Sequence, residues 1–164
     1  DNLIALHQFP NIKVMDFYSN IAATLHEIKL YKEALLYYEK MVEVTEIEKL
    51  WLPALNCMAH CQRMLGMDIN IPKLDDKHIA RNSILDQKAY KYFITKNVET
   101  FAKINFILKE IAPFLMYESL IKVFSDEMEF LLKETGSYKN LYLFNMIIQE
   151  NKKKWNDDFI RNSK

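Results

Sequence analysis

Apolar side chains recur at helical spacing between Phe17 and Val44, and this stretch guides the interpretation of the rest of the chain. In its first half the apolar stripe of a 3.6-residue helix is formed by Phe17, Ile21, Ala22, Leu25 and Ile28. In its second half the stripe is formed by Tyr31, Ala34, Leu35, Tyr38 and Met41. The pattern predicts an antiparallel hairpin with a turn at Lys29–Leu30. Such a hairpin has too little core to fold alone and needs stacked neighbours.

The remaining pattern predicts an all-α chain of about seven helices. Period-two alternation is missing, and two glycines and four prolines provide few turn residues for a β-rich fold. Pro72 breaks the helical pattern, so an irregular connector is expected over 67–76. We expect the helices at 11–29, 31–47, 50–66, 76–94, 97–112, 113–134 and 137–155, followed by a frayed tail at 156–164.

Large and small side chains across the hairpin follow the spacing of a known repeat. The repeat has a large residue, an aliphatic–small pair, an aromatic or aliphatic residue, a turn, an aromatic residue and then an alanine. These positions are held by Tyr18, Ile21–Ala22, Leu25, Tyr31 and Ala34. The stretch therefore resembles the tetratricopeptide repeat (TPR) family. It departs from the family at the turn, where Lys29 replaces glycine, and near Glu46, where the closing proline is absent.

The same offsets recur along the chain. Ala59 lies 37 residues after Ala22, and Gly136 aligns with Lys29 at an offset of 107 residues. The best repeats are 15–48 and 51–66, and weaker ones are 85–112 and 122–155. The resemblance implies one domain, 1–164, folded as a short right-handed superhelix of stacked hairpins. One hairpin partner is missing, most simply the helix that 67–76 fails to form, and helix parity across 67–112 stays open.

Charge and hydropathy restrict the partners. Lys plus Arg and Asp plus Glu each number 22, so the net charge is zero, and direct nucleic-acid binding by this domain is not expected. No signal peptide or run of about 20 apolar residues is present, so membrane insertion is not expected. The sequence begins at Asp1 without methionine, which is consistent with an excised fragment of a larger regulator or enzyme. Two cysteines fit a reducing, cytoplasmic location.

Residues capable of chemistry do not form a recognisable active site. Cys57, His60 and Cys61 occupy adjacent turns of one helix, but a zinc site needs a second ligand cluster and none is present. We interpret the cysteines as buried apolar side chains. Glycine occurs only at positions 66 and 136, so the chain has no Gly-rich phosphate loop. We therefore expect no enzyme activity, no metal and no cofactor, although a site assembled from distant residues remains an alternative.

The resemblance points to a concave groove lined by the first helix of each hairpin. The side chains expected on that face, and taken as the protein- or peptide-binding residues, are Asn20, Glu27, Asn56, His60 and Arg63. An amide such as that of Asn20 or Asn56 donates to and accepts from a peptide backbone at once. Arg63 is suited to hold a carboxylate with two hydrogen bonds.

Two functional interpretations follow. The first is a non-enzymatic module that binds a protein or peptide in this groove. In a narrower version of this hypothesis, the chain resembles the sensor part of bacterial peptide-pheromone receptors. That resemblance implies a helix-turn-helix upstream of Asp1. The alternative is a structural subunit or oligomerisation domain that packs on another folded protein, or on a second copy, through exposed aromatic side chains.

Overall fold

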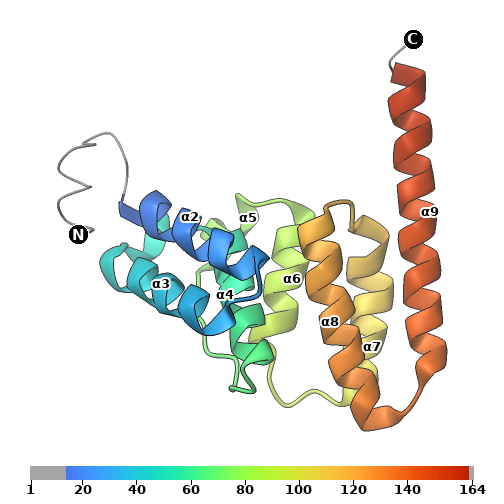
Figure 1. The fold of residues 1–164 in the computed structure, drawn as a ribbon, viewed down its shortest axis with the longest axis horizontal. Coiled ribbons are helices and arrows are strands. Elements are labelled where there is room, and N and C mark those ends of the chain that lie inside the picture. The colour runs from blue at the N-terminus through green and yellow to red at the C-terminus, as the bar shows by residue number, and fades with distance from the viewer. Residues whose placement is uncertain (1–13, 163–164) are drawn as a thin grey trace. The chain divides into compact units, whose positions relative to one another are not determined.

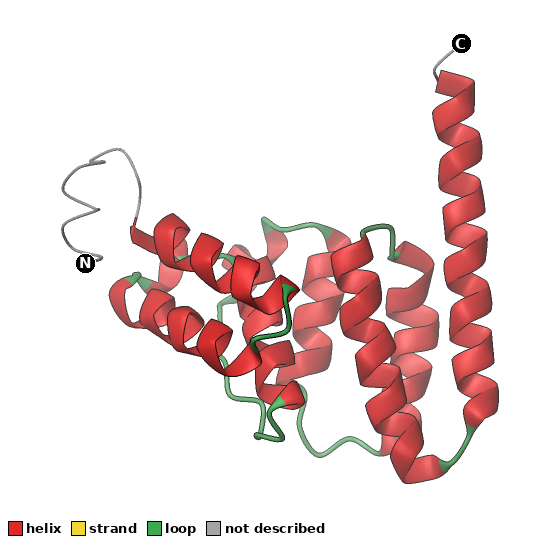
Figure 2. Cartoon of the chain, in the orientation of Figure 1, coloured by secondary structure: helices red, strands yellow, loops and turns green. Residues whose placement is uncertain are grey.

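The computed structural model describes residues 14–162, and within them every regular element is helical (Figures 1 and 2). These residues contain eight α-helices and no strand, which confirms the all-α prediction. The chain forms two compact units, Asp1–Ile94 and Thr95–Lys164, and each is described by itself. Predicted features of residues 1–13 lie outside the described part of the chain.

The first unit contains the hairpin predicted from the sequence. Its helices are α2 (Val14–Glu27), α3 (Tyr31–Val44), α4 (Leu52–Met64), α5 (Asp76–Ala80) and α6 (Ile84–Ile94), with a 3₁₀ turn at Ile47–Lys49.

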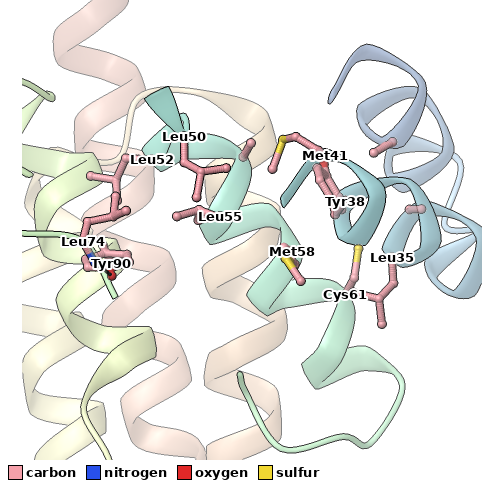
Figure 3. Packing of buried hydrophobic residues seen from close by; sticks show 13 residues of the cluster. Leu35, Tyr38, Met41, Leu50, Leu52, Leu55, Met58, Cys61, Leu74 and Tyr90 are labelled. Carbon is pink, nitrogen blue, oxygen red and sulfur yellow. Dashed lines mark hydrogen bonds between the residues drawn. The ribbon is translucent and has the colours of Figure 1, made fainter. Parts of the chain in front are cut away.

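Small side chains bring α2 and α3 close together. Ala22 and Ala34 are fully buried, and a methyl side chain on each helix lets the two backbones approach. Tyr38 and Met41 then pack toward α4, where Leu55 and Met58 belong to the same buried cluster (Figure 3). Apolar burial of this kind stabilises a fold by roughly 25 cal/mol per Å² removed from water. The core of this unit therefore joins three helices that are separate in the sequence.

The turn between α2 and α3 is left-handed although it contains no glycine. Lys29 has φ 67°. The Leu30 N–H donates to the Leu25 carbonyl over 2.9 Å and the Lys29 N–H to the His26 carbonyl over 3.0 Å, the two bonds of a Schellman motif. The absence of glycine, noted as a departure from the TPR pattern, therefore leaves the turn geometry intact.

Helix α4 ends in the same way. Gly66 has φ 73°, and the Met67 N–H donates to the Gln62 carbonyl over 2.9 Å. Gly66 lies 37 residues after Lys29, the same offset that relates Ala59 to Ala22. The two helices thus share both their small packing residue and the geometry of their C-terminal caps.

Left-handed residues recur along the described chain at nearly regular intervals. Lys29, Gly66, Asn97 and Gly136 are the residues with positive φ between 14 and 162, separated by 37, 31 and 39 residues. Each lies shortly after a helix, namely α2, α4, α6 and α8. After α4 the chain forms no helix longer than five residues until α6 begins at Ile84.

An irregular segment, residues 65–75, follows α4, and we call it the connector. Gln62 of α4 holds it through two hydrogen bonds, from its Nε2 to the Asn70 carbonyl (2.9 Å) and from the Asn70 N–H to its Oε1 (2.8 Å). Tyr90 of α6 holds the other end, because its hydroxyl donates to the Pro72 carbonyl and accepts from the Leu74 N–H. The chain is irregular over 67–75 as predicted, whereas Asp76 already begins α5.

The prediction of one helix over 76–94 is wrong. The chain forms α5, turns at 81–83 and starts α6 at Ile84. Ser83 causes the restart, since its Oγ accepts from the Asp86 N–H and donates to the Asp86 carboxylate. This Ser-x-x-Asp arrangement satisfies backbone donors at the N-terminus of a helix.

The second unit is built around a helix break at Pro113. Its elements are α7 (Thr100–Phe106), a π-turn (Ile107–Ile111), a 3₁₀ turn (Ala112–Phe114), α8 (Glu118–Thr135) and α9 (Tyr138–Asn162). Proline has no N–H and its ring clashes with the carbonyl four residues earlier, so the regular helix stops before it. The predicted break is confirmed, but the following helix begins at Glu118 and not at Pro113.

Helix α9 is longer than predicted. The tail expected over 156–164 is wrong for 156–162, which continue the helix. Phe144 and Ile148 are buried within the first half of α9, whereas Trp155 and Phe159 in the second half are 54% and 64% exposed. The C-terminal half extends past the ends of α7 and α8 (Figure 1). Asn151 joins α9 to the Pro113 break, donating to the carbonyls of Ala112 (2.8 Å) and Leu115 (3.1 Å).

None of the helices between 14 and 162 combines the length and apolar character needed to cross a membrane.

Candidate functional site

The outward face of α2 carries two of the predicted binding residues. Asn20 and Glu27 are exposed, and so are Asp16 and Ala23, which share their side of the helix at spacings of three and four residues. Ala22 is buried on another side of the helix, and Ser19, at the border of the exposed face, is buried as well. The structure therefore leaves Asn20 and Glu27 open to contact a partner, and their role in binding remains a prediction.

Asn56 and His60 do not lie on an open face, and the prediction of their exposure is wrong. Asn56 is 1% exposed and His60 is 2% exposed. The Asn56 Nδ2 donates to the carbonyl of Asp86 over 3.2 Å, while its Oδ1 is buried with no hydrogen-bond donor in the described part of the chain. Packing of α6 on α4 explains the burial, because the start of α6 covers the surface that the amide was expected to present.

His60 is buried in contact with another histidine. Its Nδ1 lies 2.7 Å from the Nε2 of His26, so α2 and α4 share a hydrogen bond between two imidazoles. Aromatic rings from α3 surround the pair: Tyr31 meets both imidazoles edge-on and Tyr38 meets His26. The pair therefore links α2 to α4, and His60 is too deeply buried to contact a partner.

Arg63 lies one turn beyond His60 and is half-buried. It is the last of the predicted residues, and a guanidinium at this position is partly accessible from outside the unit. Its proposed interaction with a carboxylate of a partner stays a prediction.

The two cysteines are held as neutral thiols. Burial raises the pKa of the Cys57 thiol to about 11, although the Tyr38 hydroxyl that donates to its sulfur opposes this shift. Burial, together with the nearby Cys57, raises the pKa of the Cys61 thiol to about 12. The pKa of Tyr38 is raised strongly as well, mainly by burial. Since a thiolate is the nucleophile and the metal ligand, these environments oppose both roles.

A metal-binding cluster is not found between residues 14 and 162, where no three His, Cys, Asp or Glu side chains are arranged around a common point. Cys57 and Cys61 are not joined in a disulfide.

A groove that the sequence did not indicate lies between α3, α4 and the connector, and we call it the connector groove. Its volume is about 630 Å³, which falls in the range of small-molecule and peptide sites. The lining side chains come from all three segments: Glu39, Val42, Met58, Gln62, Met67, Asp68, Asn70, Ile71 and Pro72. The available signal in the sequence was the loss of the second helix after Gly66, which leaves one side of α4 without a helical partner.

The second unit has a smaller cavity of about 290 Å³ at the base of the projecting half of α9. Trp155 and Leu115 form apolar walls, and a salt bridge between Lys152 and Glu118 (3.2 Å) spans part of its edge. Beyond it, Trp155 and Phe159 stack with ring centroids 6.1 Å apart. This aromatic pair continues the buried seam of Phe144 and Ile148 along the helix.

No protein-family model matches the chain, and comparisons with curated proteins and with solved structures also find no match.

Proposed function

We propose that the chain is a non-enzymatic, TPR-like helical repeat module that binds a protein or peptide segment. The observation that carries this proposal is the recurrence of left-handed turns after α2, α4, α6 and α8 at spacings of 37, 31 and 39 residues. These spacings lie near the TPR period of about 34 residues. Stacked helical pairs of this kind form extended concave surfaces, and such surfaces are used for binding.

In this proposal the binding face is formed by the first helix of each pair. Asn20 and Glu27 on α2 are exposed and Arg63 on α4 is half-exposed, so these three side chains are the binding residues. Asn56 and His60 are assigned to the support of that face, since their polar atoms serve α6 and α2. The protonated thiols of Cys57 and Cys61 agree with a binding role in a reducing, cytoplasmic setting and offer no nucleophile.

The experiment compares peptide binding by wild type and two triple variants. The test variant carries Asn20→Ala, Glu27→Ala and Arg63→Ala. The control carries Lys32→Ala, Glu33→Ala and Glu43→Ala, three exposed positions on α3. Peptides are selected on the wild type from a random 12-residue library, and affinities are then measured for all three proteins. We expect selected peptides to bind the wild type and the control alike and to lose at least tenfold in affinity for the test variant.

Melting temperatures of the three proteins establish that the variants are folded, and a ligand specific for the folded state raises them further. Equal binding by the folded test variant would remove this face as the site. Failure to select any peptide would overturn peptide binding itself.

A structural subunit is the second candidate, and the exposed aromatic seam of α9 favours it. Trp155 and Phe159 lie on the same side as the buried Phe144 and Ile148 but are more than half exposed in the second unit. Exposed apolar surface of this kind often marks a protein interface. If this candidate holds, the wild type self-associates in light scattering and Trp155→Lys with Phe159→Lys abolishes the association. A wild type that stays monomeric at high concentration would contradict self-assembly through this seam.

A further inference from the structure

We infer that the connector groove binds a short peptide segment in which aliphatic side chains alternate with lysine or arginine. This inference rests on the proposed function, whose binding face on α2 and α4 is a different surface, and it assigns a second contact with its own ligand chemistry.

The groove exists because α4 lacks a helical partner on one side. Helix α2 is followed at once by α3, whereas the chain after Gly66 runs as the connector. The connector covers only part of the flank of α4 and of the neighbouring α3. A space of about 630 Å³ remains between the three segments.

The floor of the groove is apolar. Its buried and half-buried apolar lining residues are Val42, Met58, Ile71 and Pro72, and Met67 also lines the groove with 45% of its surface exposed. Full burial of one aliphatic side chain of a ligand here contributes roughly 1.5–3 kcal/mol. Two methionines add adaptability, because an unbranched thioether adjusts to ligands of different shape. The floor therefore suits one or two aliphatic side chains.

The edge of the groove is acidic. Glu39 on α3 and Asp68 on the connector are exposed, and none of the nine lining residues is a cation. Neither carboxylate makes an ion pair with any residue between 14 and 162. Two uncompensated negative charges flanking an apolar floor attract a ligand that has positive charges on both sides of an apolar anchor.

The connector wall is held in place before a ligand arrives. Both backbone polar groups of Asn70 are bonded to the Gln62 side chain, which is 3% exposed. A wall that is already ordered loses little conformational entropy when a ligand binds. Affinity for even a short peptide is therefore expected.

The test uses three fluorescein-labelled peptides: Lys-Leu-Lys-Leu-Lys, its counterpart with Glu in place of Lys, and its counterpart with Ser in place of Leu. Binding is measured by anisotropy at low salt, with ¹³C-methyl methionine spectra to locate the contact. Only the first peptide is expected to bind well, and among the eight methionines the signals of Met58 and Met67 are expected to shift most. Raising the salt concentration weakens the binding, because the carboxylates are exposed.

Two matched double variants complete the test. Glu39→Lys with Asp68→Lys reverses the acidic edge and is expected to weaken the first peptide by at least about tenfold. Glu33→Lys with Glu43→Lys makes the same change in net charge at exposed positions of α3 outside the groove, and its affinity is expected to stay within about twofold.

Equal affinity of both variants, shifts confined to other methionines, or no binding by the wild type at millimolar peptide would each overturn the inference. The proposed function is judged separately. If library peptides bind and depend on Asn20, Glu27 and Arg63 while Lys-Leu-Lys-Leu-Lys does not bind, the function stands and this inference fails.

Discussion

His26 and His60 join α2 to α4 through a single hydrogen bond of 2.7 Å between Nε2 of the first ring and Nδ1 of the second. One proton serves both nitrogens, because a neutral imidazole donates from one nitrogen and accepts at the other. Two protonated rings would place two N–H groups face to face, so the bond requires that at least one imidazole is neutral, and His60 is only 2% exposed.

The bond should therefore stabilise the first unit. His60→Ala removes the α4 partner of the His26 Nε2 and is expected to lower the free energy of unfolding by about 1–3 kcal/mol. His78→Ala, which lies outside the pair, is the control and should change stability by less than about 0.5 kcal/mol. Urea unfolding at one constant pH measures both variants. Equal losses in the two variants would contradict the link.

The left-handed turn at Lys29 is a site where glycine should stabilise the fold. A side chain at φ 67° carries a steric cost of roughly 1–2 kcal/mol that glycine lacks, partly offset by the greater entropy of unfolded glycine. We expect Lys29→Gly to raise the free energy of unfolding by about 0.5–1 kcal/mol. Lys29→Ala removes the charge and keeps the strain, so it should leave stability nearly unchanged. A gain from alanine equal to that from glycine would assign the effect to charge.

Gly66 and Gly136 provide the reverse test. Both have positive φ, and a Cβ at either would meet no atom within 4 Å, so a substitution there changes backbone strain and not packing. Alanine at each position is expected to cost about 1 kcal/mol in chemical denaturation. A neutral result at both positions would show that these turns relax without strain.

The thiols of Cys57 and Cys61 should react slowly in the folded protein. Their pKa values are raised to about 11 and about 12 from an ordinary 9.0 by burial, so few thiolates form near pH 8. A group with a raised folded pKa contributes stability fully below its unfolded pKa and loses it as pH rises through the folded pKa. Stability should therefore fall between about pH 9 and 12, and Cys61→Ser should reduce that fall. Rapid labelling of the folded protein by a disulfide reagent at pH 8 would refute the assignment.

Asn151 should be important for the second unit. Its Nδ2 donates to the carbonyls of Ala112 and Leu115, where the break at Pro113 leaves acceptors without a regular helical donor. Asn151→Ala loses both bonds and is expected to cost about 1–3 kcal/mol. Asn145→Ala, an exposed asparagine on the same helix, is the control and should change stability by less than about 0.5 kcal/mol. Equal losses in both variants would point to helix propensity instead.

Much of the fold was predictable because its signals are local. Helices α2, α3 and α4 coincide with apolar stripes in the sequence. Pro72 and Pro113 interrupt the helical pattern because proline cannot continue a regular helix. The restart at Ser83 was local too, since Ser-x-x-Asp is a capping signal, but the apolar pattern over 76–94 concealed it. The length of α9 was underestimated because its last turns, 156–162, lack the buried apolar stripe from which the other helices were predicted.

The candidate site was less predictable. Asn20 and Glu27 are exposed as expected because one helical stripe determines which side of α2 faces inward. Asn56 and His60 lie on α4, which is covered on two sides. An apolar stripe predicts only one buried side of a helix, so it placed these two residues on the exposed side. The connector groove depends on residues from 39 to 72 meeting around a space, which no local pattern encodes.

By itself the sequence determined that this chain is helical, where most helices begin and end, and which residues close its first hairpin. Each depends on hydrogen bonds and side-chain periodicity within a few residues. Only the tertiary structure decided that Asn56 and His60, which were expected to contact a partner, bond to neighbouring helices. It also decided that an acidic groove lies beside α4. Burial and charge at a point in space are sums over segments far apart in the chain, and they exist only once those segments have packed.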